Sequence, residues 1–498
     1  MSRFHEYPHY DALGLAELVR SGDISPKELL AEARARLEAV DARFNAVVHL
    51  SDTLPNALIG GLDKTSVFCG VPFLVKDLML PFKGMPLSNG TQAMKEYYPE
   101  QNSKMADRLT ASGLITFGKT TTSELGASSL TKTVAFGETL NPWDVSKNAG
   151  GSSGGSSVVL ATRVVPMAYA SDGGGSIRLP ASYCGIFGFK PSRGINQYED
   201  MSKAWGGAVV SHAATRSVRD SAAYLDLVSG NIGEKYSATD PHPSSYLHAA
   251  TREDRQLRIG VITDAPTQTD VHPHCRDAAL HAANICEDFG HQVEPTAWNF
   301  EGRALMRAFL RIVMHYTHRD VQAIATLLDV RKADLAIELN TTFMSAAGSG
   351  ISHEEVTQSL AVWEKASSQL SELHQQFDVI LTPTVATPPL HSDALDPSAF
   401  EKLLMKVLLV TGLAKRSVND KSLEMLIDKS LYQTPFTPIA NMTGQPAMSV
   451  PLYWDEHGLP HGAHFMAKAG DDGTLLMLAH QLEREKPWAD RLPIDIGG

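Results

Sequence analysis

Two segments rich in glycine and serine, together with one lysine, carry residue types that could perform nucleophilic chemistry. Residues 148–157 read NAGGSSGGSS, and residues 171–180 read SDGGGSIRLP. Glycine permits tight loops whose backbone N–H groups turn toward a ligand, and a row of such groups binds anions, including a developing oxyanion. A serine in such a loop can act as a nucleophile when a base lies beside it. We therefore expect the two segments to form loops that meet in space.

The base for such a serine is usually a histidine, but neither segment contains one. Lys76 is the better candidate, because it follows a run of apolar residues and proline in GVPFLVKD and is expected at the end of a buried strand. Burial can lower the pKa of a lysine from about 10.4 by several units, and a neutral amine can accept a proton from a hydroxyl. The alternative is a lysine that simply ends a strand at the surface. The G-x-S-x-G pattern at 150–154 is weak support for a histidine-dependent enzyme, since any Gly/Ser run matches it.

A flexible linker is the alternative interpretation of 148–157, because Gly/Ser runs are typical of tethers. A linker should lack order on either side. Here Asn141-Pro142-Trp143-Asp144 precedes the run and a helix-like apolar stretch follows it. The linker hypothesis predicts protease cleavage within 150–157, and the loop hypothesis predicts resistance.

The ordered set of motifs resembles the amidase signature family. The similarity lies in GVPFLVKD at 70–77, GGSSGGSS at 150–157 and SDGGGSIRLPASYCGIFGFKPSRG at 171–194. GKTTTSELG at 118–126, NPWD at 141–144 and TPIANMTGQPAMSVPL at 437–452 are also similar. Within the family, the sequence looks nearest to bacterial small-molecule amidases such as nylon-oligomer cyclic-dimer hydrolases and aryl acylamidases.

The resemblance implies a Ser–cis-Ser–Lys triad. Ser176 matches the nucleophile, Lys76 matches the lysine, and Ser152 matches the bridging serine, whose preceding peptide bond is cis. The bridging hydroxyl can donate and accept at once, so it would pass a proton from the nucleophile to the neutral lysine and later return it to the leaving amine. The oxyanion hole of the family matches the backbone N–H groups of Gly173, Gly174, Gly175 and Ser176.

The resemblance also implies supporting residues around the triad. Asp172 and Arg178 match an acid–base pair that would lie behind the reacting groups, with a surface ion pair as the alternative. Ser153 would brace Ser152 by a hydrogen bond, or would only fill the loop. Many family members read Asp-Thr-Gly-Gly-Ser where this chain has Asp172-Gly173-Gly174-Gly175-Ser176. Because the oxyanion hole is made of main-chain amides, the additional glycine is compatible with it.

The function implied is a serine hydrolase that cleaves the C–N bond of a small carboxamide through an acyl-enzyme. A carbamate (urethane) or aryl-anilide hydrolase would use the same triad. A glutamine amidotransferase subunit is a further alternative, which the apolar segment 400–431 does not favour. A catalytically inactive binding module is the last, and the presence of all three matched residues argues against it. No cofactor and no metal is expected: VHPHC at 271–275, with His272, His274 and Cys275, is interpreted as a helix start.

Composition limits the partners. The chain has 498 residues and a formal net charge of −12, with no long Lys/Arg run, so neither a nucleic acid nor a membrane is expected as a partner. A homodimer stays open. The first residues lack the apolar core of a signal peptide, which predicts a cytoplasmic protein. The four cysteines form no C-x-x-C pair, so we expect reduced, buried thiols at Cys69, Cys184, Cys275 and Cys286.

The elements that must position these residues alternate between strand-like and helix-like segments. This pattern predicts an α/β fold, and the resemblance implies the amidase-signature form of it, with a central mixed, twisted β-sheet covered by helices on both faces. We expect one domain over 1–498 with a signature core at about 67–194. Ser25-Pro26-Lys27-Glu28 predicts a capped helix start, and Gly230 a helix stop.

Three further segments complete the expectation. Residues 230–256 and 382–397 are interpreted as surface loops. Residues 400–431 are interpreted as a helical insertion whose apolar run packs in the core, with a lid over the substrate cavity as the alternative. We expect the substrate pocket to be built from 124–130, 306–318 and 400–431, with Met314 and His315 in the core or at the pocket.

Overall fold

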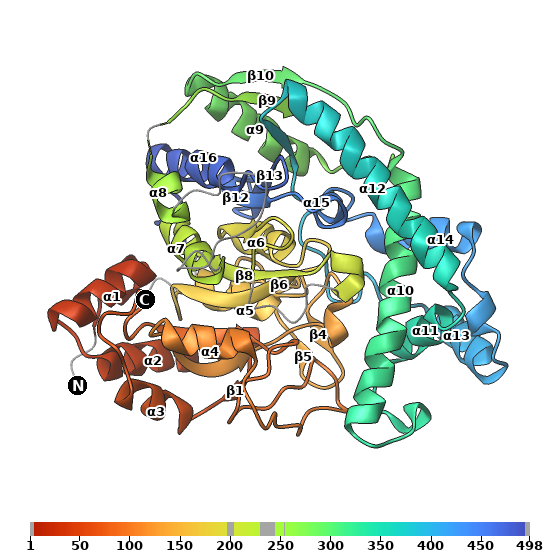
Figure 1. Cartoon of the computed structure of the whole chain (residues 1–498), viewed down its shortest axis with the longest axis horizontal. Helices are drawn as coiled ribbons and strands as arrows, with labels where there is room; N and C mark the ends of the chain where they lie inside the picture. The colour runs from red at the N-terminus through yellow and green to blue at the C-terminus, as the bar shows by residue number, and fades with distance from the viewer. Residues whose placement is uncertain (1–3, 197–203, 230–244, 253, 494–498) are drawn as a thin grey trace.

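A computed structural model describes residues 4–196, 204–229, 245–252 and 254–493 (Figure 1). Its strands, in chain order, are β1 (Val47–Leu50), β2 (Pro72–Lys76), β3 (Ile115–Thr120), β4 (Lys132–Thr133), β5 (Gly137–Glu138), β6 (Met167–Asp172), β7 (Gly188–Lys190), β8 (Val210–Thr215), β9 (Arg258–Val261), β10 (Gln292–Pro295), β11 (Val379–Pro383), β12 (Ala447–Trp454) and β13 (Pro460–Ala467).

The helices are α1 (Ala12–Ser21), α2 (Pro26–Phe44), α3 (Leu54–Gly60), α4 (Lys104–Ala111), α5 (Gly154–Ala161), α6 (Arg178–Cys184), α7 (Val218–Val228), α8 (Tyr246–Thr251), α9 (Pro273–Asp288), α10 (Gly302–Leu327), α11 (Leu339–Gly348), α12 (His353–Gln376), α13 (Ala399–Val410), α14 (Asp420–Leu426), α15 (Thr437–Thr443) and α16 (Asp472–Glu485). Short 3₁₀ turns include η2 (Glu124–Gly126) and η3 (Ala204–Gly207), and a π-helical turn, η6 (Ile427–Leu431), follows α14. Ser25 caps α2 with the predicted capping box, in which its hydroxyl accepts from the Glu28 N–H and the Glu28 carboxylate accepts from the Ser25 N–H.

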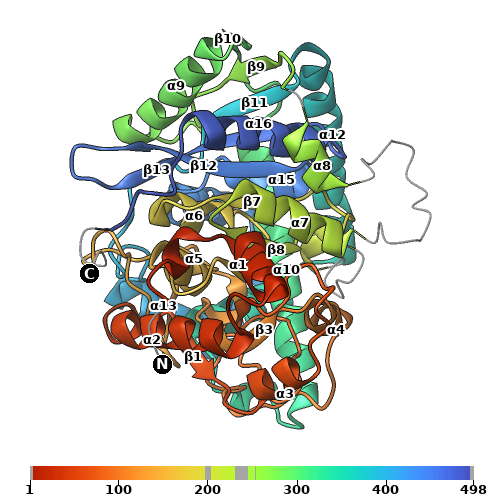
Figure 2. The same ribbon diagram turned by 90° about the vertical axis from the view of Figure 1, so that its left-hand side faces the viewer.

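The strands form two large mixed sheets joined edge to edge. One has the order β1-β3-β2-β6-β8 and the other β10-β9-β11-β13-β12-β7. A bridge between Phe187 and Thr215 links the β7 and β8 edges, and Figure 2 shows the strands following one another from β10 at the top to β1 at the bottom. Helices α7, α8 and α16 lie on one side of these strands and α10 and α12 on the other (Figure 1). The predicted α/β class, with a mixed sheet covered on both faces, is confirmed.

The centre of the first sheet brings the predicted reactive segments together. Strands β2 and β6 are parallel neighbours, with Leu74 opposite Ala168 and Val75 opposite Tyr169. Parallel strands end at the same edge of a sheet, where ligand sites of α/β folds form. Lys76 therefore ends β2 beside Ser171 and Asp172, which end β6.

The predicted surface loops are partly wrong. Helix α8 lies within 230–256 and buries the Tyr246 side chain completely, because it packs against α7 and α16. Residues 230–244, and with them the predicted helix stop Gly230, lie outside the described residues. In 382–397, β11 continues to Pro383, and Thr382, Thr384 and Ala386 are fully buried, so only the second half of that segment is exposed.

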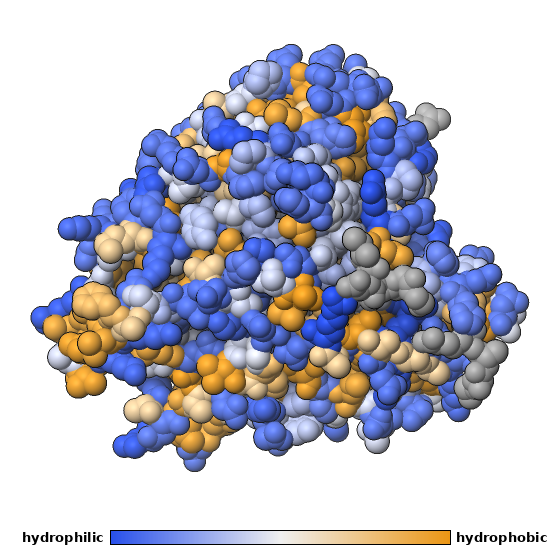
Figure 3. Space-filling view, turned by 180° about the vertical axis from the view of Figure 1, so that it is seen from behind, coloured by the Kyte–Doolittle hydropathy of each residue, from blue (hydrophilic) through white to orange (hydrophobic). Residues whose placement is uncertain are grey.

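Core packing is also wrong for the first part of 400–431. Helix α13 buries no residue, and Phe400 and Val410 are 72% and 89% exposed. The apolar stripe of this helix faces solvent, at the end of the molecule where Figure 3 shows apolar side chains at the left. Farther along, Ala414, Leu423 and Ile427 are buried, and the last two join the core. A sequence period shows that a helix is amphipathic but not which face it turns to the protein.

The remaining expectations concern thiols, metals and membranes. All four cysteines are free and buried, and His272 caps α9, so VHPHC is a helix start as predicted. Among the described residues, no group of three His, Cys, Asp or Glu side chains could hold a metal ion. In the same part of the chain, no helix is long and apolar enough to cross a bilayer.

Candidate active site

Lys76 is buried at the end of β2 and touches three serine hydroxyls. Its Nζ lies 2.7 Å from Ser152 Oγ, 2.8 Å from Ser153 Oγ and 3.1 Å from Ser171 Oγ. The side chain has no exposed surface, so the alternative of a lysine at the surface is wrong. The Lys76 amine is thus surrounded by three serine hydroxyls in the interior of the protein.

Burial changes the proton affinity of this lysine. Desolvation lowers the pKa of Lys76 from its ordinary value of 10.5 to about 7, while the nearby Asp172 carboxylate raises it by a smaller amount. A substantial fraction of the amine is therefore neutral near neutral pH. A neutral amine carries a lone pair that can accept a hydroxyl proton.

The run 148–157 is an ordered, fully buried loop that leads into α5. The Gly151–Ser152 peptide bond is cis, as the resemblance implies. Asn148 Oδ1 accepts from the Gly150 N–H at 3.0 Å, and Thr131 Oγ1 donates to the Gly150 carbonyl at 2.8 Å and accepts from the Gly154 N–H at 3.1 Å. The linker interpretation is wrong, because the loop is held on both sides by buried side chains.

Glycine is required inside this run where α5 crosses the sheet. A Cβ at Gly155 would lie 2.4 Å from the Ala46 carbonyl oxygen and 2.5 Å from the Thr121 nitrogen. Both contacts are to backbone atoms, which cannot give way cheaply. The close approach holds Ser152 and Ser153, three and two residues before Gly155, against Lys76.

Ser176 lies beside these serines through its backbone. Its carbonyl accepts from the Ser153 N–H at 3.3 Å, and its side chain is half-buried, more open than that of Ser152. Among the described residues, the Ser176 hydroxyl has no hydrogen-bond partner, so it is not bonded to Ser152 in this structure. The structure therefore brings Ser152 and Lys76 into direct contact and places Ser176 next to them with a free hydroxyl.

The backbone amides of 173–176 differ in their availability. The Gly175 N–H donates to Asp172 Oδ1 at 2.7 Å. In the described part of the chain, the amides of Gly173, Gly174 and Ser176 donate to no group. The expected set of four amides for an oxyanion is therefore reduced to three, because Asp172 already occupies the fourth.

Asp172 and Arg178 form a buried, two-point ion pair rather than a surface pair. Arg178 Nη2 and Nε lie 2.8 and 3.0 Å from the two carboxylate oxygens, and both side chains have no exposed surface. The Arg178 guanidinium and the Asn441 amide hold the pKa of Asp172 well below its ordinary value, against the opposing effect of burial. The carboxylate also accepts from the Ile177 N–H at 3.0 Å, so the pair fixes both ends of the loop that carries Ser176.

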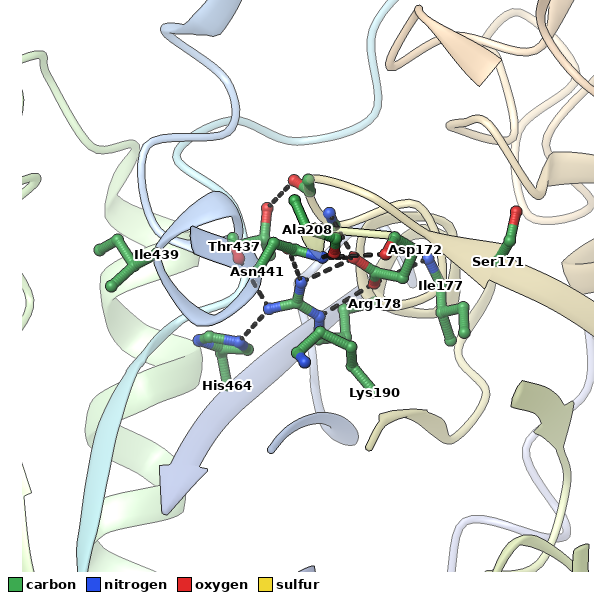
Figure 4. A network of polar contacts seen from close by, with 12 residues as sticks. Ser171, Asp172, Ile177, Arg178, Lys190, Ala208, Thr437, Ile439, Asn441 and His464 are labelled. Atoms are coloured by element: carbon green, nitrogen blue, oxygen red, sulfur yellow. Dashed lines mark hydrogen bonds and ion pairs between the residues drawn. The ribbon is translucent and has the colours of Figure 1, made fainter. Parts of the chain in front are cut away.

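Figure 4 shows Arg178 at the centre of a larger network. Its guanidinium also donates to the Thr437 carbonyl at 2.9 Å, to Asn441 Oδ1 at 2.6 Å and to His464 Nε2 at 2.9 Å. Burial and the Arg178 charge lower the pKa of His464 well below its ordinary value, so this ring is neutral and accepts. The Nε, Nη1 and Nη2 atoms of the buried Arg178 side chain thus all donate to acceptors, as a buried charge requires.

Ser153 does not brace Ser152 directly. Its hydroxyl accepts from Lys76 and donates to the Ser171 carbonyl at 3.2 Å, so it holds the lysine instead. Ser171 is a contact of Lys76 that the sequence did not indicate. Ser171 lies on β6, four strands after β2 in the chain, and it reaches Lys76 only because β6 pairs with β2 in parallel.

The predicted pocket segments differ in their distance from the site. A Cβ at Gly126 would lie 3.4 Å from Ser152 Oγ, so 124–130 adjoins the bridging serine. In α10, Phe309 meets the loop at Gly174, whereas Met314 packs in the core. Helix α13 packs against α11.

The chain is similar to known amidases along most of its length. The Amidase family model matches residues 28–476. The 6-aminohexanoate-cyclic-dimer hydrolase of Pseudomonas sp. (strain NK87) is 31% identical over 493 residues, 97% of this chain and 96% of that protein. The putative amidase AmiC of Mycobacterium bovis is 30% identical over 503 residues, 98% of each chain.

Solved structures agree over the whole fold. A 6-aminohexanoate cyclic dimer hydrolase complexed with substrate superposes with a TM-score of 0.87 at 29% identity, over 98% of this chain and 99% of that one. A bacterial aryl acylamidase of the amidase signature enzymes superposes with a TM-score of 0.83 at 24% identity, over the same shares. At that lower identity the similarity concerns the fold alone.

Proposed function

The chain belongs to the amidase signature family and is an amidase, and from this premise we propose that Ser176 attacks the carbonyl carbon of a small carboxamide. The reaction would cleave the C–N bond through an acyl-enzyme. The observation that carries the proposal is the contact of 2.7 Å between the buried Lys76 amine and the Ser152 hydroxyl, beside the free hydroxyl of Ser176.

The first step is activation of the nucleophile. A neutral lysine has two N–H donors and one lone pair. Ser153 uses its own proton on the Ser171 carbonyl, so it can only accept from Lys76. Of the two remaining hydroxyls, that of Ser152 is nearer to Lys76 than that of Ser171, at 2.7 Å against 3.1 Å, and we assign it as the donor to the lone pair. The Ser152 oxygen is then left to accept the Ser176 proton. As Ser176 Oγ bonds to the carbonyl carbon, one proton moves from Ser176 to Ser152 and another from Ser152 to Lys76.

The tetrahedral intermediate carries its negative charge on the former carbonyl oxygen. The unbonded amides of Gly173, Gly174 and Ser176 are suited to hold it, since pre-placed donors in a site with little water stabilise developing charge. The Gly175 amide is not proposed for this role, because Asp172 binds it. Asp172 and Arg178 act on the loop rather than on substrate.

Collapse of the intermediate returns the protons in the opposite direction. Lys76 passes one back through Ser152 to the leaving nitrogen, so that an amine departs instead of an amide anion. Water then attacks the acyl-enzyme, with the same relay taking its proton, and releases the carboxylate. The expectation of no cofactor and no metal stands as part of this proposal.

Two alternative functions are compatible with the same triad. A carbamate or aryl-anilide hydrolase would need only a different pocket, because the acyl transfer is the same. An amidotransferase subunit, which is the less favoured alternative, would need a polar pocket and partner subunits. The remaining expectations, a cytoplasmic enzyme without nucleic-acid or membrane partners, with homodimerisation open, are proposals as well.

The test is turnover of p-nitroacetanilide by wild type and by Ser176→Ala. We expect the variant to lose about 10³-fold or more in kcat, as for other single members of a catalytic unit. Ser157→Ala is a matched control, since its hydroxyl is buried in the same run and bonds to no described residue. Equal turnover by wild type and Ser176→Ala would contradict the proposal, and an ester and a carbamate measured in parallel would separate the alternatives.

A further inference from the structure

The loop proposed to hold the oxyanion has two aromatic rings against its glycines. A Cβ at Gly173 would lie 3.0 Å from Trp205 Cε3, and a Cβ at Gly174 would lie 2.9 Å from Phe309 Cζ. The two rings pack edge to face, with centroids 6.2 Å apart. Trp205 and Phe309 therefore form one aromatic surface, called here the aromatic wall, next to the two amides.

Trp205 is held in an unusual conformation at this place. Its φ is +49°, in the left-handed region that large residues avoid, and Gly206 and Gly207 follow at +66° and +88°. Such backbone persists only where the surroundings enforce it, and it gathers at functional sites. The segment is fixed from outside, because the Gly207 carbonyl accepts from Arg193 Nε at 2.7 Å and the Ala208 carbonyl accepts from Asn441 at 3.0 Å.

The exposure of the two rings differs. Phe309 is 5% exposed and serves as the support, since Trp363 packs on it with ring centroids 6.5 Å apart. Trp205 is only half-buried, so the residue keeps surface that the core does not cover. The half-open ring lies against Gly173, and the half-open Ser176 is three residues farther along the same loop.

The space for the indole comes from the missing side chain at position 173. The family pattern places a threonine here, and this chain has glycine. At 3.0 Å even a single Cβ would press on the ring, and a branched side chain would displace it. The additional glycine of the loop is thus linked to the position of Trp205.

We propose that Trp205 is a specificity-determining residue that binds an aromatic group of the substrate next to the scissile carbonyl. The inference rests on the proposed function and names its substrate class: amides that carry an aryl group, such as anilides. Two aromatic rings that meet edge to face or offset face to face contribute binding free energy in addition to that of the area they bury. A small aliphatic amide would reach the three amides of the loop without reaching the indole.

The experiment compares kcat/KM for p-nitroacetanilide and for propionamide in wild type, Trp205→Ala, Trp205→Phe and Gly173→Thr. We expect Trp205→Ala to lower the anilide value by about 10- to 100-fold, mainly through KM, and to change the propionamide value by less than about threefold. Trp205→Phe should restore much of the anilide value, and Gly173→Thr should lower it as Trp205→Ala does. Trp363→Phe, which alters the packing behind Phe309 and Gly206 and leaves Trp205 in place, is the control and should keep the wild-type ratio.

Separate measurements report on folding, on catalysis and on binding of the aryl group. Far-UV circular dichroism and thermal unfolding show whether each variant is folded. Binding of acetanilide to Ser176→Ala, with and without Trp205→Ala, is measured by calorimetry, and we expect about tenfold weaker binding without the indole. An equal loss for both substrates in a folded variant, or no loss of acetanilide binding, would overturn the role of Trp205. Full turnover by Ser176→Ala would instead overturn the proposed function, and the binding measurement would still decide on Trp205.

Discussion

Lys76 Nζ and Ser152 Oγ lie 2.7 Å apart although 76 residues separate them in the chain. The contact depends on two features of the fold. Strand β2 ends at the edge where β6 ends, and α5 approaches the backbone at Ala46 and Thr121 so closely that Gly155 is required. A proton can pass directly between the two side chains, and the pKa of the amine decides at which pH it does so.

The pH dependence of activity should follow the amine. Because burial lowers the pKa of Lys76 to about 7, the neutral form that accepts the proton is lost below that pH. We expect kcat/KM to rise with pH through about 7 and to fall about tenfold per unit on the acid side. A rate profile between pH 5 and 9 with a non-ionising substrate measures this. An acid limb near pH 4 would show that a carboxylate, not Lys76, controls the rate.

The same shift predicts a pH-dependent stability. Between the folded pKa of about 7 and the ordinary value of 10.5, the unfolded lysine binds a proton that the folded one does not, so this group makes the protein more stable as pH rises through that window. Lys76→Met removes the contribution. The stability difference, wild type minus variant, should therefore increase between pH 7 and 10, measured by thermal unfolding. A constant difference would contradict the shifted pKa; Lys190, whose pKa burial also lowers to about 7, is present in both proteins.

Ser152→Ala and Ser153→Ala should differ in kind. Ser152→Ala breaks the relay, and we expect kcat to fall about 10²- to 10⁴-fold with no rescue by pH. Ser153→Ala removes an acceptor that favours the charged amine, so the pKa of Lys76 should fall further and the acid limb should move to lower pH, with a smaller loss of kcat. The two profiles are compared directly. Identical losses with an unmoved acid limb in Ser153→Ala would show that this serine does not hold the amine.

The sequence predicts those features of the fold that depend on residues close together in the chain. The capping box at Ser25, the buried strand before Lys76 and the glycine-rich loops follow from neighbours in the chain, and the motif order pointed to Ser152 and Ser176. What could not be predicted depends on pairing between distant segments. Ser171 reaches Lys76 only because β6 pairs with β2. The Gly175 amide is unavailable because Asp172 folds back onto it, which no spacing indicates.

Orientation was the second limit. The period of 400–410 fits an amphipathic helix equally well with its apolar face turned inward or outward, and the structure turns it outward. The helix α8 lay in a segment whose prolines and polar residues favoured a loop, and tertiary packing of Tyr246 outweighed that preference.

Asp172→Asn should damage both stability and catalysis. The change leaves the Arg178 guanidinium buried without its carboxylate, and breaking a buried pair in this way costs about 3–5 kcal/mol. An asparagine oxygen can replace only part of the acceptor set that binds the Gly175 and Ile177 amides, so the loop before Ser176 should also lose its fixed shape. We expect a large decrease in the midpoint of thermal unfolding and a fall in kcat that persists well below that midpoint. The wild-type pair should itself weaken as pH falls through the acid range. The pKa of Asp172 is depressed in the folded state, so its stabilisation is complete above the ordinary pKa and is lost as pH falls from there toward the folded pKa.

Asp378→Asn, which breaks the more exposed pair with Arg258, is the matched control and should lose much less stability and no activity. If the two variants lose stability equally, the Asp172–Arg178 pair does not fix the loop.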